Sequence, residues 1–150
     1  MTSNRKDVRI KRATADNLFE GLKRMIIEVN TSDNFNYRID KAILFGSYVN
    51  SNSDTVGDLD VAISLKPKWE SEKQREKDDI KSKECKSNDF LSCLFWPQTE
   101  VKRYIKNRSA YISIHTLELT RKLFSIKTTL NCLWIDVCPH KLYSYNIICK

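Results

Sequence analysis

Two aspartates, Asp58 and Asp60, interrupt an apolar segment that otherwise has the pattern of a buried strand, and the apolar residues continue past both acids through Ile63. Unpaired carboxylates are costly to bury, and strand residues spaced i and i+2 point to the same face. The pair therefore predicts a cation site, and Mg²⁺ suits two carboxylate oxygens that leave room for water and phosphate. The alternative interpretation is a polar turn after Gly57 with Asp60 at a sheet edge.

A second turn precedes the acid pair. Gly46 and Ser47 follow directly on the apolar run 42–45. Glycine lets the backbone approach a ligand closely, serine caps a turn or binds a phosphate oxygen, and free N–H groups at such a turn bind anions. A Gly-Ser pair alone is typical of an ordinary turn. Its position between an apolar strand and two carboxylates predicts a phosphate site beside a metal site.

The remaining pattern alternates helices and strands within one domain, residues 1–150. The expected elements are a helix from Ala13 capped by Thr14, with an apolar stripe of Leu18, Leu22, Met25, Ile26 and Val29, then strands 39–45 and 58–65, a helix from Pro97, strand 110–115, helix 116–124 and strand 130–137. This order predicts an α/β (α+β) fold with a small mixed β-sheet flanked by helices. We expect residues 1–12 to be flexible and residues 120–150 to form a divergent tail.

Two segments between these elements allow alternative interpretations. The charged segment 66–88 is either a solvated helix or a mobile excursion. The run from Phe90 to Trp96 is dense in apolar side chains and must be buried or bound to a partner. Burial in the core is the favoured interpretation for this run. The helix after Pro97 has a basic outer side between Lys102 and Arg108.

Charge and cysteine content restrict the environment and the partners. The net charge of +7 favours anionic partners, or it serves solubility alone. Nucleic acid ranks last, because the basic residues are scattered among acids. No apolar segment has the length of a membrane span, and five irregularly spaced cysteines predict free thiols. A zinc site at Cys132, Cys138 and His140 is disfavoured because its spacing matches no zinc pattern. We therefore expect a cytoplasmic protein.

The motif resembles a known signature. The motif consists of Phe45-Gly46-Ser47, ten further residues, and Asp58-Leu59-Asp60-Val61. It is similar to the signature of nucleotidyltransferases of the DNA polymerase β superfamily. The length of the chain is similar to that of the minimal nucleotidyltransferase domains of bacteria and archaea. The motif covers about residues 42–65, and the segment 94–115 also resembles small bacterial nucleotidyltransferase-like proteins.

The resemblance implies roles for the motif residues. Gly46 and Ser47 would bind the β/γ-phosphates of a nucleoside triphosphate such as ATP, and Asp58 and Asp60 would hold one or two Mg²⁺ ions, with Mn²⁺ as an alternative. The reaction would move a nucleoside monophosphate to a protein, small-molecule or RNA acceptor and release pyrophosphate. The resemblance also implies the antitoxin-like half of a toxin–antitoxin pair, with a helical protein partner.

Active members of this superfamily generally carry a third carboxylate on a later strand that faces the pair. In this chain the corresponding strand, 110–115, contains no acid. The candidates for the third group are His115, Glu118 and Asp136. Each also has an ordinary interpretation, as a strand-end cap, a surface helix residue and an edge residue respectively. The alternative function is therefore a catalytically degenerate nucleotidyltransferase fold that acts as a binding or interaction module.

Overall fold

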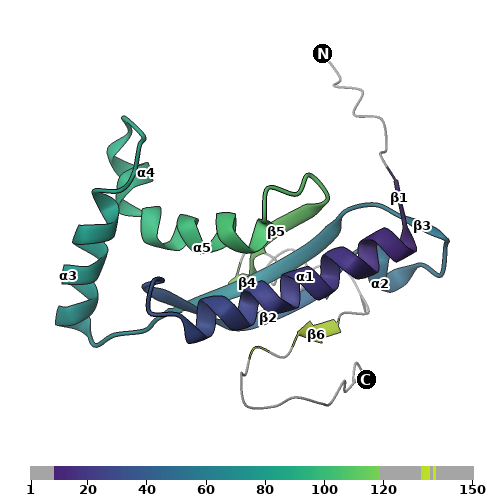
Figure 1. The fold of residues 1–150 in the computed structure, drawn as a ribbon, viewed down its shortest axis with the longest axis horizontal. Helices are drawn as coiled ribbons and strands as arrows, with labels where there is room; N and C mark the ends of the chain where they lie inside the picture. Colours follow the sequence, from purple (N-terminus) through teal and green to yellow (C-terminus); the bar gives the residue numbers. More distant parts are fainter. Residues whose placement is uncertain (1–8, 119–132, 136, 138–150) are drawn as a thin grey trace.

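A mixed four-stranded sheet forms the centre of the molecule (Figure 1). The computed structural model describes residues 9–118, 133–135 and 137. The elements are β1 (Ile10–Lys11), α1 (Arg12–Thr31), β2 (Tyr37–Phe45), α2 (Ser47–Asn50), β3 (Thr55–Val56), β4 (Leu59–Pro67), α3 (Ser71–Ser82), α4 (Phe90–Leu94), α5 (Trp96–Lys106), β5 (Ile112–Thr116) and β6 (Leu133–Ile135). None of the described helices is long and apolar enough to span a membrane.

The strand order of the sheet is β5-β4-β2-β6. β2 pairs antiparallel with β4 from Tyr37 opposite Pro67 to Phe45 opposite Asp60, and β6 pairs antiparallel with the other edge of β2. β5 runs parallel to β4, which requires a long crossover, and α3, α4 and α5 provide it. This arrangement confirms the predicted α/β (α+β) class with a small mixed sheet and helices packed on it.

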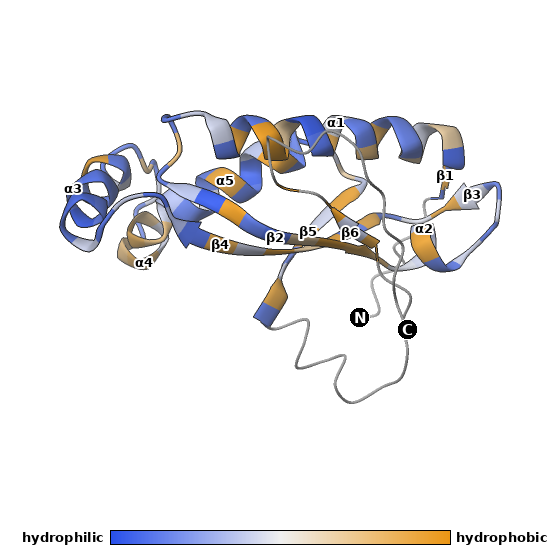
Figure 2. Ribbon diagram, turned by 90° about the horizontal axis from the view of Figure 1, so that it is seen from below, coloured by the Kyte–Doolittle hydropathy of each residue, from blue (hydrophilic) through white to orange (hydrophobic). Residues whose placement is uncertain are grey.

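The hydrophobic core lies between one face of the sheet and the helices α1 and α5 (Figure 2). Helical spacing places Leu22, Ile26 and Val29 on the buried stripe of α1, as predicted, and Val101 and Ile105 on that of α5. The other buried positions of α1 are Ala15 and Phe19, whereas the predicted Leu18 and Met25 are only partly buried at the margin of the core. No described helix lies over the opposite face of the sheet (Figure 2).

The N-terminal segment contacts the rest of the fold from residue 9 onward. The sequence predicted a flexible segment up to residue 12. Ile10 is buried, and β1 pairs with β3. α1 begins at Arg12 instead of Ala13, and Thr14 does not cap it, because β1 leads directly into the helix. The Arg12 backbone N–H is satisfied by the Asp54 carbonyl at 2.8 Å.

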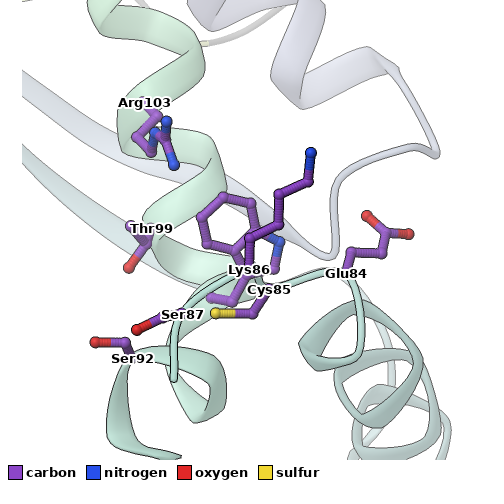
Figure 3. Close-up of a pocket in the computed structure, with 8 residues that line it drawn as sticks. Glu84, Cys85, Lys86, Ser87, Ser92, Thr99 and Arg103 are labelled. Carbon is purple, nitrogen blue, oxygen red and sulfur yellow. The ribbon is translucent and has the colours of Figure 1, made fainter. Parts of the chain in front are cut away.

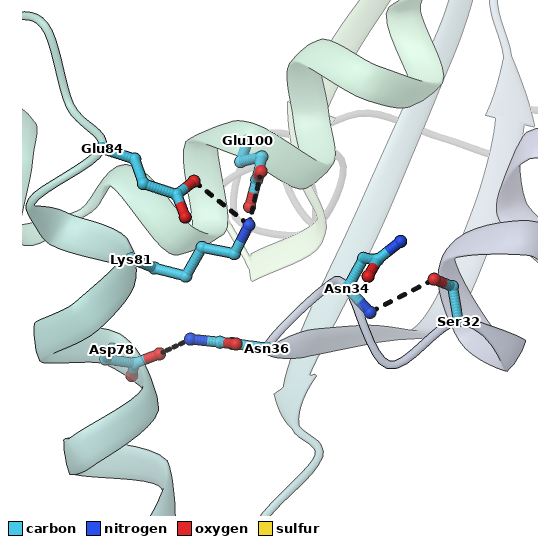
Figure 4. A network of polar contacts seen from close by, with 7 residues as sticks. All are labelled: Ser32, Asn34, Asn36, Asp78, Lys81, Glu84 and Glu100. Atoms are coloured by element: carbon cyan, nitrogen blue, oxygen red, sulfur yellow. Dashed lines mark hydrogen bonds and ion pairs between the residues drawn. The ribbon is translucent and has the colours of Figure 1, made fainter.

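The charged segment forms the helix α3, the first of its two predicted alternatives. Polar contacts of Lys81 and Asp78 hold this helix against the rest of the molecule (Figure 4). Lys81 pairs with Glu100 on α5 at 3.0 Å and with Glu84 at 3.2 Å. Asp78 accepts a hydrogen bond from the Asn36 amide at 2.9 Å, next to β2. These contacts fix a helix that buries little apolar surface of its own.

The prediction that residues 90–96 belong to the core is wrong. α4 lies beyond the end of the sheet next to α3 (Figure 1), so the sheet does not cover it. The exposed fractions of its large side chains and the next residue are 76% for Phe90, 59% for Leu91, 51% for Leu94 and 52% for Phe95. An apolar sequence does not by itself show whether another element of the fold covers the segment. Trp96 starts α5, and the Arg103 guanidinium lies 5.3 Å from the centre of its ring.

The last predicted elements lie mostly outside the described residues. The predicted strand 110–115 is confirmed as β5, shifted by one or two residues. Of the predicted helix 116–124, the structure describes only residues 116–118. Of the predicted strand 130–137, residues 133–135 form β6 and confirm that part.

Candidate functional site

The turn after β2 places Gly46 against the carboxylate of Asp60. Gly46 has a φ of 83°, which favours glycine, and a Cβ at this position would lie 2.5 Å from Asp60 Oδ2. The Gly46 carbonyl accepts hydrogen bonds from the N–H groups of Val49 at 3.2 Å and Asn50 at 3.0 Å, which close the single turn of α2. The position of the Asp60 carboxylate therefore leaves no room for a side chain at Gly46.

Ser47 links the two halves of the motif. Its Oγ accepts a hydrogen bond from the backbone N–H of Gly57 at 3.0 Å, immediately before Asp58. The sequence predicted that this hydroxyl caps the turn or binds phosphate. As an acceptor from Gly57 it retains its own proton, which it can still donate to a ligand oxygen.

The two carboxylates lie at the start of β4, on the face of the sheet that carries no described helix. β4 begins at Leu59, so Asp58 directly precedes the strand instead of opening it as predicted. Asp60 lies opposite Phe45 of β2 and opposite Ser113 of β5. The Asp60 side chain is 31% exposed and Asp58 is partly buried, so both remain accessible from solvent.

β5 supplies a polar partner for each carboxylate. The Ser113 hydroxyl donates to Asp58 Oδ2 at 3.2 Å, and His115 Nε2 lies 3.2 Å from Asp60 Oδ1. The ring centres of His115 and Phe45 are 5.4 Å apart, so the imidazole lies between an aromatic ring and a carboxylate. Because Ser113 and His115 are spaced i and i+2 on one strand, all four side chains share one face.

Of the two candidates for the third group that the structure describes, His115 contacts the pair and Glu118 does not. Glu118 is exposed, and Asp136 lies outside the described residues. Within residues 9–118, 133–135 and 137, no three acidic, histidine or cysteine side chains are placed to hold a metal together. Two carboxylates still fit Mg²⁺, because this ion is usually held by one or two carboxylates plus water and substrate phosphate.

Sequence reasoning missed Arg12, which organises the segment between the turn and the acids. Its guanidinium donates to the carbonyl oxygens of Tyr48 at 3.2 Å and Ser53 at 3.0 Å, and also to that of Ser51. One planar donor group thus fixes three points of one loop. No local pattern marks Arg12, since it lies within a generally basic N-terminal segment. Ser113 was missed for a similar reason, because only strand register places it beside Asp58.

Tyr48 anchors the same turn to α1 and gives a pH-dependent prediction. Its hydroxyl donates to Asp16 Oδ1 at 2.6 Å, and burial followed by this bond raises the pKa of Tyr48 from 10.0 to about 12. Because the folded state raises this pKa, the protonated tyrosine stabilises the fold below pH 10.0, and that contribution is lost as the pH rises toward about 12. Urea unfolding across this range should show a steeper loss of stability in the wild type than in Tyr48→Phe. Equal slopes would contradict the prediction.

Comparisons of the chain with protein-family models, with curated proteins and with solved structures found no match.

Proposed function

We propose that the protein is a metal-dependent nucleotidyltransferase that moves a nucleoside monophosphate from a nucleoside triphosphate to an acceptor. One observation carries this proposal. The Asp60 carboxylate packs against Gly46 so closely that no Cβ fits between them, with 2.5 Å from such an atom to Asp60 Oδ2. The turn at Gly46 and Ser47 and the acid pair therefore lie side by side. The resemblance of the motif indicates the type of chemistry.

Each residue of the cluster would have a separate task. Asp58 and Asp60 would hold Mg²⁺, or Mn²⁺ in its place. When bound, the ion would offset the charge of the triphosphate and stabilise the leaving pyrophosphate. Ser47 has a hydroxyl proton to donate to a phosphate oxygen, and His115 orients Asp60 through its 3.2 Å contact. Arg12 keeps the loop between the turn and the acids in place.

The acceptor and the protein partner are proposals from the same resemblance. A protein, a small molecule or an RNA would receive the nucleotide. The antitoxin-like role in a toxin–antitoxin pair implies a helical partner protein. The exposed apolar side chains of α4 and of the residue after it support such a partner, because a cluster of exposed apolar side chains is typical of a protein-binding surface. They are Phe90, Leu91, Leu94 and Phe95.

The test is a transfer assay on the full chain. Each ribonucleoside triphosphate, labelled at the α-phosphate, is incubated with Mg²⁺ and with protein, RNA and small-molecule acceptors, and pyrophosphate release and labelled acceptor are measured. We expect release that stops when the metal is chelated. Equal pyrophosphate release and acceptor labelling by the wild type and by a folded Asp58→Ala plus Asp60→Ala variant would refute the proposed enzyme activity.

A nucleotide-binding module without transfer is the second candidate, and one observation favours it. At the place where active members carry the third carboxylate, β5 presents Ser113 and His115. This candidate predicts that the wild type binds nucleoside triphosphate without transfer and that Ser113→Asp gains transfer. Transfer by the wild type would exclude this candidate, and a Ser113→Asp variant that binds nucleotide without any transfer would exclude a missing acid as the cause.

A further inference from the structure

A pocket of about 580 Å³ lies away from the sheet, between the loop that follows α3, the helix α4 and the first turns of α5 (Figure 3). No lining residue belongs to a strand, so this pocket is separate from the cluster around Asp58 and Asp60. Its lining includes Cys85, Lys86 and Ser87 of the loop and Trp96 of α5. A thiol, Cys85, is thus part of the wall of a solvent-accessible cavity.

A second thiol, that of Cys93, lies next to the loop that carries Cys85. Cys93 of α4 donates its S–H to the carbonyl of Ser87 at 3.3 Å, which brings its sulfur to the loop two residues beyond Cys85. Cys85 is also close enough to contribute to a raised pKa of the Cys93 thiol. Both cysteines are free and partly exposed. A small reagent that enters the pocket therefore reaches the thiol of Cys85, while the thiol of Cys93 lies on the carbonyl of Ser87, another lining residue.

The backbone on both sides of the pair is held by hydrogen bonds. The Cys85 N–H donates to the Ser82 carbonyl at 3.2 Å at the end of α3, and the Cys93 N–H donates to the Asp89 carbonyl at 3.2 Å within α4. Asp89 also caps α4, because its carboxylate accepts from the Ser92 N–H at 2.8 Å. A disulfide forms without strain only if the backbone of the two cysteines does not have to move far, and these hydrogen bonds hold the backbone at both residues.

We propose that Cys85 and Cys93 form a redox-active dithiol site, which a peroxide oxidises reversibly to an intrachain disulfide. In the first step a thiolate sulfur attacks a peroxide oxygen, the O–O bond breaks, and with hydrogen peroxide one water leaves after protonation, giving a sulfenic acid. In the second step the other sulfur attacks the sulfenic sulfur, the S–O bond breaks, and a second water leaves. Two thiols are oxidised, and one peroxide is reduced to two waters.

The contacts assign different tasks to the two sulfurs. The neighbouring Cys85 thiol and, after it, desolvation raise the pKa of Cys93. Cys85 lines the pocket and Cys93 does not, so we assign the attack on the peroxide to the sulfur of Cys85. Cys93 then forms the disulfide as the resolving thiol.

Trypsin makes the test direct, because Lys86 lies between the two cysteines. Cleavage gives one peptide Glu84–Lys86 and a second Ser87–Lys102, each with one cysteine. The folded chain is treated with hydrogen peroxide, its remaining thiols are alkylated, and the digest is analysed by mass spectrometry. We expect these two peptides as one linked species that separates on reduction, and as the dominant linkage among all five cysteines.

Two controls make the result decisive. In urea the linkages should spread over several cysteine pairs, because the fold no longer selects one pair. Cys93→Ser should instead accumulate sulfenic acid on Cys85, detected by trapping with a cyclic diketone. A folded wild type in which Cys85 and Cys93 are both alkylated after peroxide treatment, or in which either pairs mainly with another cysteine, would overturn the proposal.

Discussion

Replacing Asp60 with asparagine is expected to lower the rate of nucleotide transfer by at least about 100-fold, and Asp58→Asn should have an effect of the same order. Asparagine keeps the shape of the side chain but removes the negative charge that would bind the metal. The hydroxyl of Ser113 and the imidazole of His115 can still hydrogen-bond to the amide oxygen. The fold should therefore persist while the metal affinity falls.

The measurement is transfer rate against Mg²⁺ concentration for the wild type and each variant. Asp40→Asn is the matched control, because Asp40 also lies on a strand and loses the same charge, but pairs with Lys66 at 3.1 Å away from the acid pair. This control should keep nearly the wild-type rate. If Asp60→Asn kept the wild-type rate and metal dependence, Asp60 would not be a metal ligand.

The second large effect is expected at Gly46. Gly46→Ala should lower the free energy of unfolding by about 1–3 kcal/mol, since alanine at a φ of 83° is strained. The new Cβ would also lie 2.5 Å from Asp60 Oδ2, so either the turn or the carboxylate must shift. Transfer should fall together with stability, because the same shift displaces Asp60.

Gly21 provides the matched control in the same chain. A Cβ added at Gly21, in the middle of α1, would have no atom within 4 Å, so Gly21→Ala should stabilise the protein by about 0.5–1 kcal/mol. Urea unfolding of both variants gives the two changes on one scale. If Gly46→Ala were as stable as the wild type, the close contact between Gly46 and Asp60 would be wrong.

Local patterns predicted the elements that carry the candidate site. The apolar run ending at Gly46 became β2, and the run containing Asp60 became β4, because alternating burial is visible in the sequence of a strand. The stripe of α1 was correct at Leu22, Ile26 and Val29. The sequence explained Gly46 by the close approach of a ligand, whereas the structure places the Asp60 carboxylate against it, which no local pattern predicted.

The remaining features depend on contacts between distant parts of the chain. No local signal specifies that β5 aligns Ser113 with Asp60, because the register of a parallel pair is set by packing across a long crossover. The hydrogen bonds from Arg12 to three carbonyls were equally unpredictable, because Arg12 is one of several basic residues in its segment. The run from Phe90 was assigned to the core because its composition is apolar, yet only the position of α4 beyond the sheet determines that it is exposed.

The parallel pairing of β4 with β5 also has a consequence for folding. The contacts of Asp58 with Ser113 and of Asp60 with His115 each join residues 55 positions apart. Such pairing forms slowly, because a long loop must close before the contacts stabilise it. During synthesis both aspartates leave the ribosome well before β5 exists. The cluster is therefore completed only when the crossover has folded, and nucleotide binding would report on the last stage of folding instead of on the early β2–β4 pair.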